Sequence, residues 1–74
     1  MTKQEAVRGV LLGLRKMGFK RFDLLGVTNI IREEHNISIT DGSVSRYIRF
    51  ENANPESPVR SQCISRPKSW YQFV

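Results

Sequence analysis

Residues 40–49 read TDGSVSRYIR, and they combine a helix start with two distinct helix faces. Thr40 is of a type that caps helix N-termini, and the acid directly after it complements the positive end of the helix dipole. Apolar side chains then recur at spacings of three and four, at Val44, Tyr47 and Ile48. The other face carries Ser43, Arg46 and Arg49. The pattern predicts an amphipathic helix over about 41–53, ending ahead of a proline.

The N-terminal segment predicts a second helix with a marked start and end. Thr2 and Glu5 have the spacing of a capping box. Behind them, apolar residues recur at helical spacing, at Val7, Val10, Leu11, Leu14 and Met17. Gly18 stands where a left-handed C-terminal cap belongs. Gly9 and Gly13 share another face, where they are either tolerated or closely packed, or form a surface for self-association.

A third helix is predicted between these two, with its start left open. Both Thr28 and Asp23 are suitable N-cap residues. Residues 19–27 therefore fit either a loop with a short strand or the first turn of this helix. Asn36 tolerates the left-handed conformation and is placed to end it after His35.

The C-terminal residues predict a β-hairpin. Residues 59–65 and 70–74 are strand candidates, and residues 66–69 between them suit a four-residue turn, while residues 51–58 form a turn-rich linker. Such a turn places Ile64 opposite Tyr71 and Gln62 opposite Phe73, with Cys63, Trp70 and Val74 on the other face. An isolated hairpin is marginal in water, so one face is expected to pack on the helices. We interpret Trp70 as a core residue and Cys63 as partly buried.

Length and composition limit the class of protein. The chain has 74 residues, which predicts a single domain over 1–74 with one small core. It has no apolar run near the roughly 20 residues that span a bilayer, and its start lacks the apolar block of a signal peptide. One cysteine allows no internal disulfide. These features disfavour secretion, membrane insertion and a zinc-stapled fold, and they predict a cytoplasmic protein.

Positive charge is unevenly distributed along the chain. Lysine and arginine number 12 against 7 acids, which gives a net charge of +5. Residues 1–21 hold six bases and one acid, whereas residues 22–41 hold one base and four acids. A small basic domain often binds a polyanion, although a basic surface without such a partner fits the charge equally well. The acidic stretch is interpreted as a solvated face turned away from such a polyanion.

Three helices followed by a basic-tipped hairpin resemble a winged helix-turn-helix domain. Residues 28–48 look like the helix-turn-helix, and Ser43-Val44-Ser45-Arg46 is similar to the Thr-Val-Ser-Arg of lac repressor-type recognition helices. Residues 66–71 resemble the tip and return strand of a wing. The chain departs from the usual pattern at residues 39–42, which lengthen the turn. The resemblance implies an α+β fold, with a three-helix helix-turn-helix core followed by a C-terminal β-hairpin wing.

The resemblance also implies which residues would contact double-stranded DNA. Arg46 would pair with a guanine, whose O6 and N7 accept a bidentate arginine. Ser43 and Ser45 would contact phosphate or base edges, and Gly42 would let the backbone approach the groove. Arg49 would reach a phosphate, as would Arg66 and Lys68 at the wing tip, residues 66–69. The helix N-terminus itself would attract a phosphate through its N–H groups.

Candidates for catalysis or metal binding are weak. His35 and Cys63 are the only residues of their types, so the soft ligands of a metal site are missing. Serine, histidine and aspartate show no spacing that supports a triad, and adjacent Glu33 and Glu34 diverge on a helix. A phosphate-binding glycine loop is also missing. We therefore predict no enzyme activity, no metal, no cofactor and no small-molecule ligand.

The expected function is sequence-specific binding of double-stranded DNA in transcription regulation. The small size favours a regulator of phage or plasmid type, or an isolated domain, and the resemblance implies a homodimer where paired half-sites are bound. One alternative is a winged-helix protein-interaction module that docks through Trp70, Tyr71 and Phe73, or through the face of Gly9 and Gly13. A further alternative is a small inhibitor of a nucleic-acid enzyme.

Overall fold

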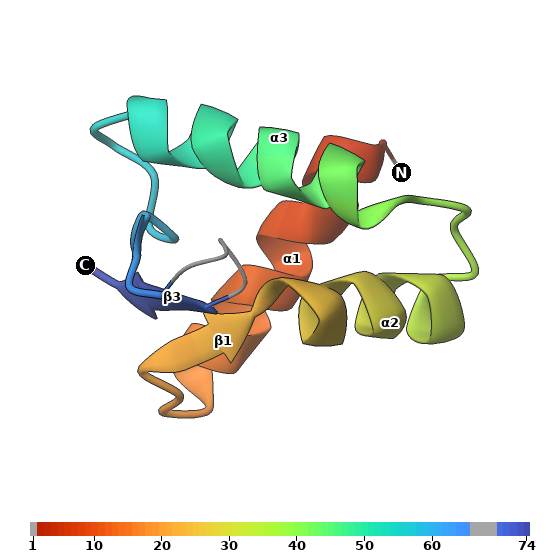
Figure 1. The fold of residues 1–74 in the computed structure, drawn as a ribbon, viewed down its shortest axis with the longest axis horizontal. Helices are drawn as coiled ribbons and strands as arrows, with labels where there is room; N and C mark the ends of the chain where they lie inside the picture. The colour runs from red at the N-terminus through yellow and green to blue at the C-terminus, as the bar shows by residue number, and fades with distance from the viewer. Residues whose placement is uncertain (1, 66–69) are drawn as a thin grey trace.

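A computed structural model describes residues 2–65 and 70–74 of the chain. Three helices pack against one another, and a small antiparallel sheet lies at one end of them (Figure 1). The helices are α1 (Lys3–Lys16), α2 (Leu24–Glu34) and α3 (Asp41–Ala53), and the strands are β1 (Arg21–Asp23), β2 (Ser61–Cys63) and β3 (Trp70–Phe73). The fold is thus α+β, with a three-helix core followed by a C-terminal β-hairpin, as expected.

Helix α1 begins and ends where the local signals indicate. Glu5 N donates to Thr2 Oγ1 at 3.1 Å, and Thr2 N donates to Glu5 Oε1 at 3.0 Å, which confirms the capping box. Gly18 adopts a φ of 92°, a conformation that favours glycine. The apolar stripe ends earlier than predicted, because Met17 is the C-cap residue and its side chain is 73% exposed.

The two glycines of α1 lie on an open surface. A Cβ atom added at Gly9 or Gly13 would meet nothing within 4 Å. The interpretation that close packing explains them is therefore wrong for the described residues. They line a shallow hollow with Met17 and the C-terminal part of α2.

Both readings of residues 19–27 hold in part, since β1 is followed directly by α2. Asp23 is the N-cap, although its side chain makes no capping hydrogen bond. Thr28 is not a cap: it lies inside α2, is 1% exposed, and its hydroxyl donates to Leu24 O at 2.8 Å. That bond to the preceding turn satisfies the buried hydroxyl, so a residue typical of caps is tolerated within the helix.

Residues 35–40 connect α2 to α3, which is longer than the three or four residues of a common helix-turn-helix. Asn36 adopts the predicted left-handed conformation, with a φ of 55°. Ile39 is buried, and its carbonyl accepts a 2.8 Å hydrogen bond from Arg32 Nε. Thr40 then caps α3 by accepting from Ser43 N at 3.2 Å, as predicted. The connection is therefore anchored to α2 on one side and to α3 on the other.

The sheet has the order β1-β3-β2, and its register differs from the predicted one. Cys63 pairs with Tyr71, Gln62 with Gln72, and Ser61 with Phe73, one residue away from the predicted pairing. The hairpin argument also left out the third strand, which bears on the inward face of β3 rather than on its register with β2. Phe22 of β1 pairs with Tyr71 and stacks on its ring at 5.3 Å, which fixes the face of β3 that turns inward.

This register places the hairpin side chains differently from the prediction. Tyr71 is buried, whereas Trp70 is 46% exposed and Ile64 is 41% exposed. Cys63 is exposed as well. The interpretations of Trp70 as a core residue and of Cys63 as partly buried are therefore wrong. The predicted turn at 66–69 lies outside the described residues.

One apolar core joins all three helices to the sheet. Its fully buried aliphatic members include Val7, Leu11, Val27, Ile31, Val44, Ile48 and Val59. The predicted linker at 51–58 also contributes: residues 51–53 form the last turn of α3, and both Glu51 and Ser57 are buried. A buried carboxylate thus lies at the contact between α3 and α1.

Candidate nucleic-acid interface

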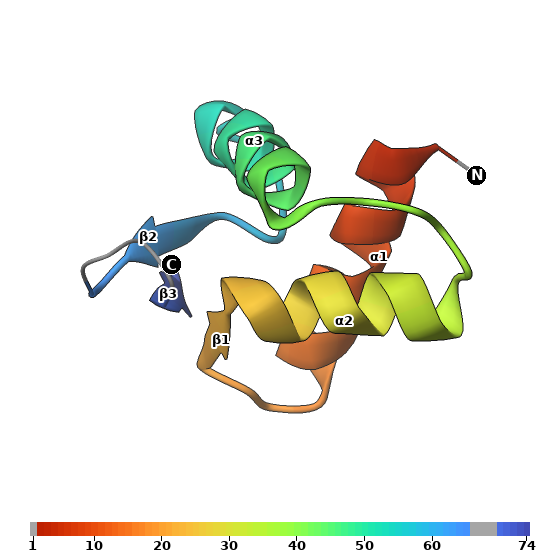
Figure 2. The same cartoon turned by 45° about the vertical axis from the view of Figure 1, so that its right-hand side comes forward.

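Helix α3 forms one border of the molecule, with the other elements on one side of it (Figures 1 and 2). Val44 and Ile48 are fully buried and fix its inner face to the core. Arg46 and Arg49 are exposed on the remaining surface, as the periodicity predicts. Two arginines are therefore held at the outer border of the protein by the packing of Val44 and Ile48 on the inner face of the helix.

The other predicted contacts on α3 differ in exposure. Gly42 is exposed, and a Cβ added there would meet only Thr40 Oγ1 at 3.9 Å, so nothing within the described chain requires a glycine. Ser43 and Ser45 are half-buried, and Ser43 Oγ accepts a 3.1 Å hydrogen bond from the Thr40 hydroxyl. The helix brings these three residues together with the two arginines. Arg66 and Lys68 lie outside the described residues.

The N-terminus of α3 is less suited to a phosphate than the sequence indicates. Thr40 Oγ1 already accepts from the N–H of Ser43. Asp41 places an exposed acid in the first turn, where it complements the helix dipole. This negative charge would repel a phosphate at the same position. We therefore expect the arginines of α3, rather than its N-terminus, to attract a phosphate.

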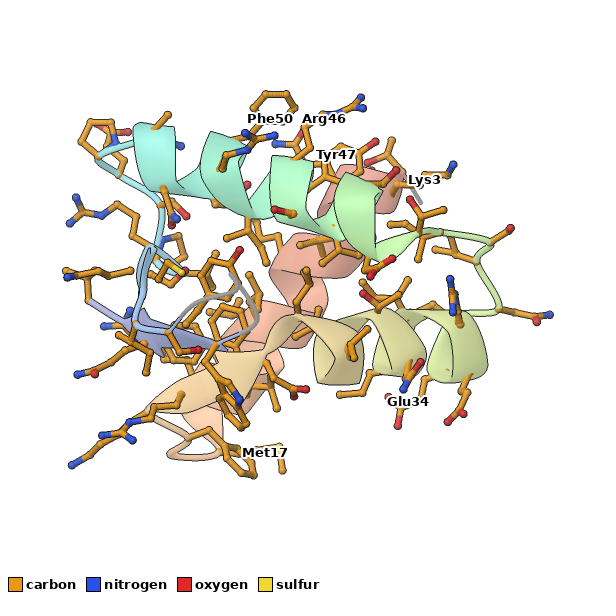
Figure 3. All side chains as sticks on the ribbon, viewed as in Figure 1. Lys3, Met17, Glu34, Arg46, Tyr47 and Phe50 are labelled. Atoms are coloured by element: carbon orange, nitrogen blue, oxygen red, sulfur yellow. The ribbon has the colours of Figure 1, made fainter. Side chains whose placement is uncertain are left out.

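Phe50 is a feature of this face that the sequence analysis missed. Its side chain is 50% exposed, and its ring meets that of Tyr47 edge-on, with centroids 6.1 Å apart. Figure 3 shows Arg46 and Phe50 on the outer side of α3, away from the rest of the molecule. The spacing of four residues from Arg46 to Phe50 is the signal that would have placed them on one face.

An ion pair with a buried carboxylate fixes the inner side of the same helical turn. Glu51 is 1% exposed, and its carboxylate accepts two hydrogen bonds from Arg8, at 2.9 and 3.1 Å. The Ser57 hydroxyl donates at 2.6 Å and the Gln4 amide at 3.4 Å. The carboxylate therefore has partners from α1 and from the segment after α3, which ties the C-terminal half of α3 to the core.

The balance of these contacts sets the charge state of Glu51. Burial alone would raise the pKa of its carboxyl, but the hydrogen bonds from Arg8, Ser57 and Gln4 outweigh that effect and lower the pKa below its usual value. The folded state thus favours the ionised carboxylate. Because the unfolded chain binds a proton more readily, the stability that Glu51 contributes is present above about pH 4.3, the ordinary glutamate pKa, and is lost as pH falls through the lower folded pKa.

We expect Glu51→Gln to flatten the acid limb of the stability curve. Denaturation in urea at pH 7 and at pH 3 would show a smaller difference between the two pH values for the variant than for the wild type. The pKa of Glu5 is also lowered, by its hydrogen bonds with Thr2. Because Glu5 is present in both proteins, its contribution to the pH dependence of stability cancels in the comparison. The same pH dependence in both would contradict a stabilising charge on Glu51.

Part of the N-terminal positive charge is used inside the fold. Arg8 pairs with Glu51, and Arg15 donates to Pro58 O at 2.9 Å while its guanidinium lies 5.7 Å from the centre of the Phe73 ring. Both arginines are nonetheless exposed, as are the other four bases of residues 1–21: Lys3, Lys16, Lys20 and Arg21. The surplus charge of this segment is therefore partly structural.

Two surface hollows lie away from α3. One, of about 240 Å³, is lined mainly by apolar side chains from α1, β1 and α2 and is bordered by Trp70. Another, of about 400 Å³, is bordered by Arg15, Lys16 and Arg60. Among residues 2–65 and 70–74, no three histidine, cysteine or acidic side chains gather in a way that could hold a metal ion.

Comparisons with protein families, with curated proteins and with solved structures find no match for this chain. Within the part of the chain that the structure describes, none of the helices has the length and apolar character needed to cross a membrane.

Proposed function

We propose that this chain binds double-stranded DNA, with the outer face of α3 in the major groove. The observation that carries the proposal is the division of α3 into two sides. Val44 and Ile48 are locked in the core, whereas Arg46 and Arg49 are exposed at the border of the molecule. An α-helix fits the major groove, and arginine is the side chain best suited to both guanine and phosphate.

The roles of the individual residues follow from their chemistry. Arg46 would pair with a guanine, and Arg49 would contact a phosphate. Ser43 and Ser45 would add contacts to phosphate or base edges, with Gly42 allowing close approach of the backbone. For Arg66 and Lys68, the proposed backbone contacts rest on the sequence alone. The proposed role is regulation of transcription without catalysis, with a homodimer where the site consists of two halves.

Titration of a random duplex at two salt concentrations tests the proposal. Each neutralised phosphate adds about 0.9 to the slope of log affinity against log salt, so three contacts would lower the affinity about 40-fold between about 50 and 200 mM. Fluorescence anisotropy of a labelled duplex measures this loss. No binding at about 50 mM salt would contradict the proposal.

A matched pair of variants locates the interface. Removing Arg46 and Arg49 together takes two charges from α3, whereas Lys16→Ala with Lys20→Ala takes two exposed charges from elsewhere. We expect the first pair to weaken binding far more than the second. Equal losses would mean that net charge, rather than the face of α3, carries the interaction.

A protein-interaction module is the second candidate, and one observation favours it. Trp70 is 46% exposed and borders the 240 Å³ apolar hollow, so a large aromatic side chain stands beside an uncovered apolar surface. Tyr71, by contrast, is buried against Phe22 and is not available for docking. This reading takes over if the chain binds no duplex.

A further inference from the structure

We infer that Phe50 reads the 5-methyl group of a thymine beside the base that Arg46 contacts. This inference rests on the proposed binding of DNA through α3 and adds a second base to its readout. It assigns a role in specificity to a residue that the resemblance to recognition helices does not mark.

Packing among residues 2–65 and 70–74 does not account for the position of Phe50. Among the described residues it is the only large apolar side chain of α3 that is strongly exposed, at 50%. It does not belong to the core or to the apolar side chains packed against it. Its aromatic neighbour is Tyr47, which does pack on the core and meets the Phe50 ring edge-on. The ring is thus supported from one side and open to solvent on the other.

The spacing of the two side chains matches the spacing of bases. Arg46 and Phe50 are four residues apart on one helix, which separates them by about 6 Å along its axis. Successive base pairs are about 3.4 Å apart. A helix lying along the groove would therefore bring Phe50 to the edge of a base one or two steps from the guanine of Arg46. Both side chains point away from the body of the molecule (Figure 3).

Thymine is the base whose edge in the major groove best suits the Phe50 ring. In the major groove, thymine presents a methyl group, and apolar side chains are its common partners. Arg46 lies one turn before Phe50 on the same face, so the ring stands beside an exposed cation. A cation next to an apolar ring favours, as the binding partner, a polyanion that carries an apolar group over a purely apolar protein surface. Contact with Tyr47 already restricts the ring, which reduces the ordering required on binding.

Replacing thymine by uracil tests the inference, because it removes only the methyl group. Sites bound by the wild-type chain would be selected from a random duplex pool, and the best site would be remade with uracil at each thymine in turn. One substitution, one or two steps from a guanine, should weaken wild-type binding about fourfold, the value for one buried methyl-sized group. Uracil at the other thymines serves as the control and should change little.

Phe50→Ala makes the matching change on the protein, so that the ring and the methyl group are each removed singly and together. The variant should bind the thymine site more weakly than the wild type does and should no longer distinguish thymine from uracil there. Phe50→Leu, which keeps an apolar side chain, should retain part of the difference. Thermal melting checks that both variants fold, which the exposure of the ring leads us to expect.

The outcomes separate the two proposals. A selected site at which no uracil weakens binding, a site without thymine, or full discrimination by Phe50→Ala would each overturn the role of Phe50 while leaving duplex binding intact. Equal weakening of thymine and uracil sites by Phe50→Ala would also overturn it, because the ring would then not contact the methyl group. No binding to any duplex would overturn the proposed function itself.

Discussion

Replacing Arg8 with alanine should lower the free energy of unfolding by about 3 kcal/mol. The change leaves the Glu51 carboxylate, which is 1% exposed, with only the Ser57 and Gln4 hydrogen bonds. Removing one partner of a buried ion pair costs about 3–5 kcal/mol, and the lower end applies because Arg8 itself is 46% exposed. In a domain of this size the melting temperature would fall by about 12–24 °C. Thermal unfolding followed by circular dichroism measures both.

Lys3→Ala is the matched control, since it removes an exposed base from the same helix. Its effect should stay within about 0.5 kcal/mol, as is usual for surface positions. A loss of less than about 1 kcal/mol for Arg8→Ala would show that the ion pair contributes no more than an exposed one. The contact of α3 with α1 would then depend on apolar packing alone.

Arg46→Ala should weaken binding to the selected site by about 1–3 kcal/mol and relax the preference at one base pair. Its effect on random duplexes should be much smaller, because a base contact carries sequence information and a phosphate contact does not. Arg49 is also exposed on the same helix, and Arg49→Ala should weaken binding to selected and random duplexes alike. Anisotropy titrations of both variants against both duplexes measure the difference.

Two results would contradict this division of roles. Equal losses on selected and random DNA for Arg46→Ala would place its guanidinium on a phosphate. A folded Arg46→Ala protein with full affinity and full selectivity would remove α3 from the interface.

The helices were predictable because their boundaries depend on residues close in sequence. The capping box of α1, the Thr40 cap of α3 and the left-handed Asn36 are each fixed within a few positions. The outward placement of Arg46 and Arg49 followed from the same periodicity. Thr28 was misread because its hydroxyl has two satisfactory partners, an N–H at a helix start or a carbonyl within a helix, and sequence alone does not distinguish them.

The features that were missed depend on residues far apart in the chain. Glu51 lies in a stretch with the composition of a linker, and its partner Arg8 stands 43 positions away. Phe22 of β1 stacks on Tyr71 of β3, a contact that the hairpin alone does not reveal, so Trp70 was interpreted as core from its residue type. Phe50 was overlooked because it continues the arginine face rather than the apolar stripe that defines the core.

The carboxylate of Glu51 has a consequence for how the molecule opens. It connects Gln4 and Arg8, in the first turns of the chain, to the last turn of the third helix. Fraying usually starts at a chain terminus and costs little. Here, loosening the first helix strips a buried charge of two of its three partners, so we expect the two helices to open together as one cooperative unit. The surface that carries Arg46 therefore persists for as long as the N-terminal helix stays folded, and is lost with it.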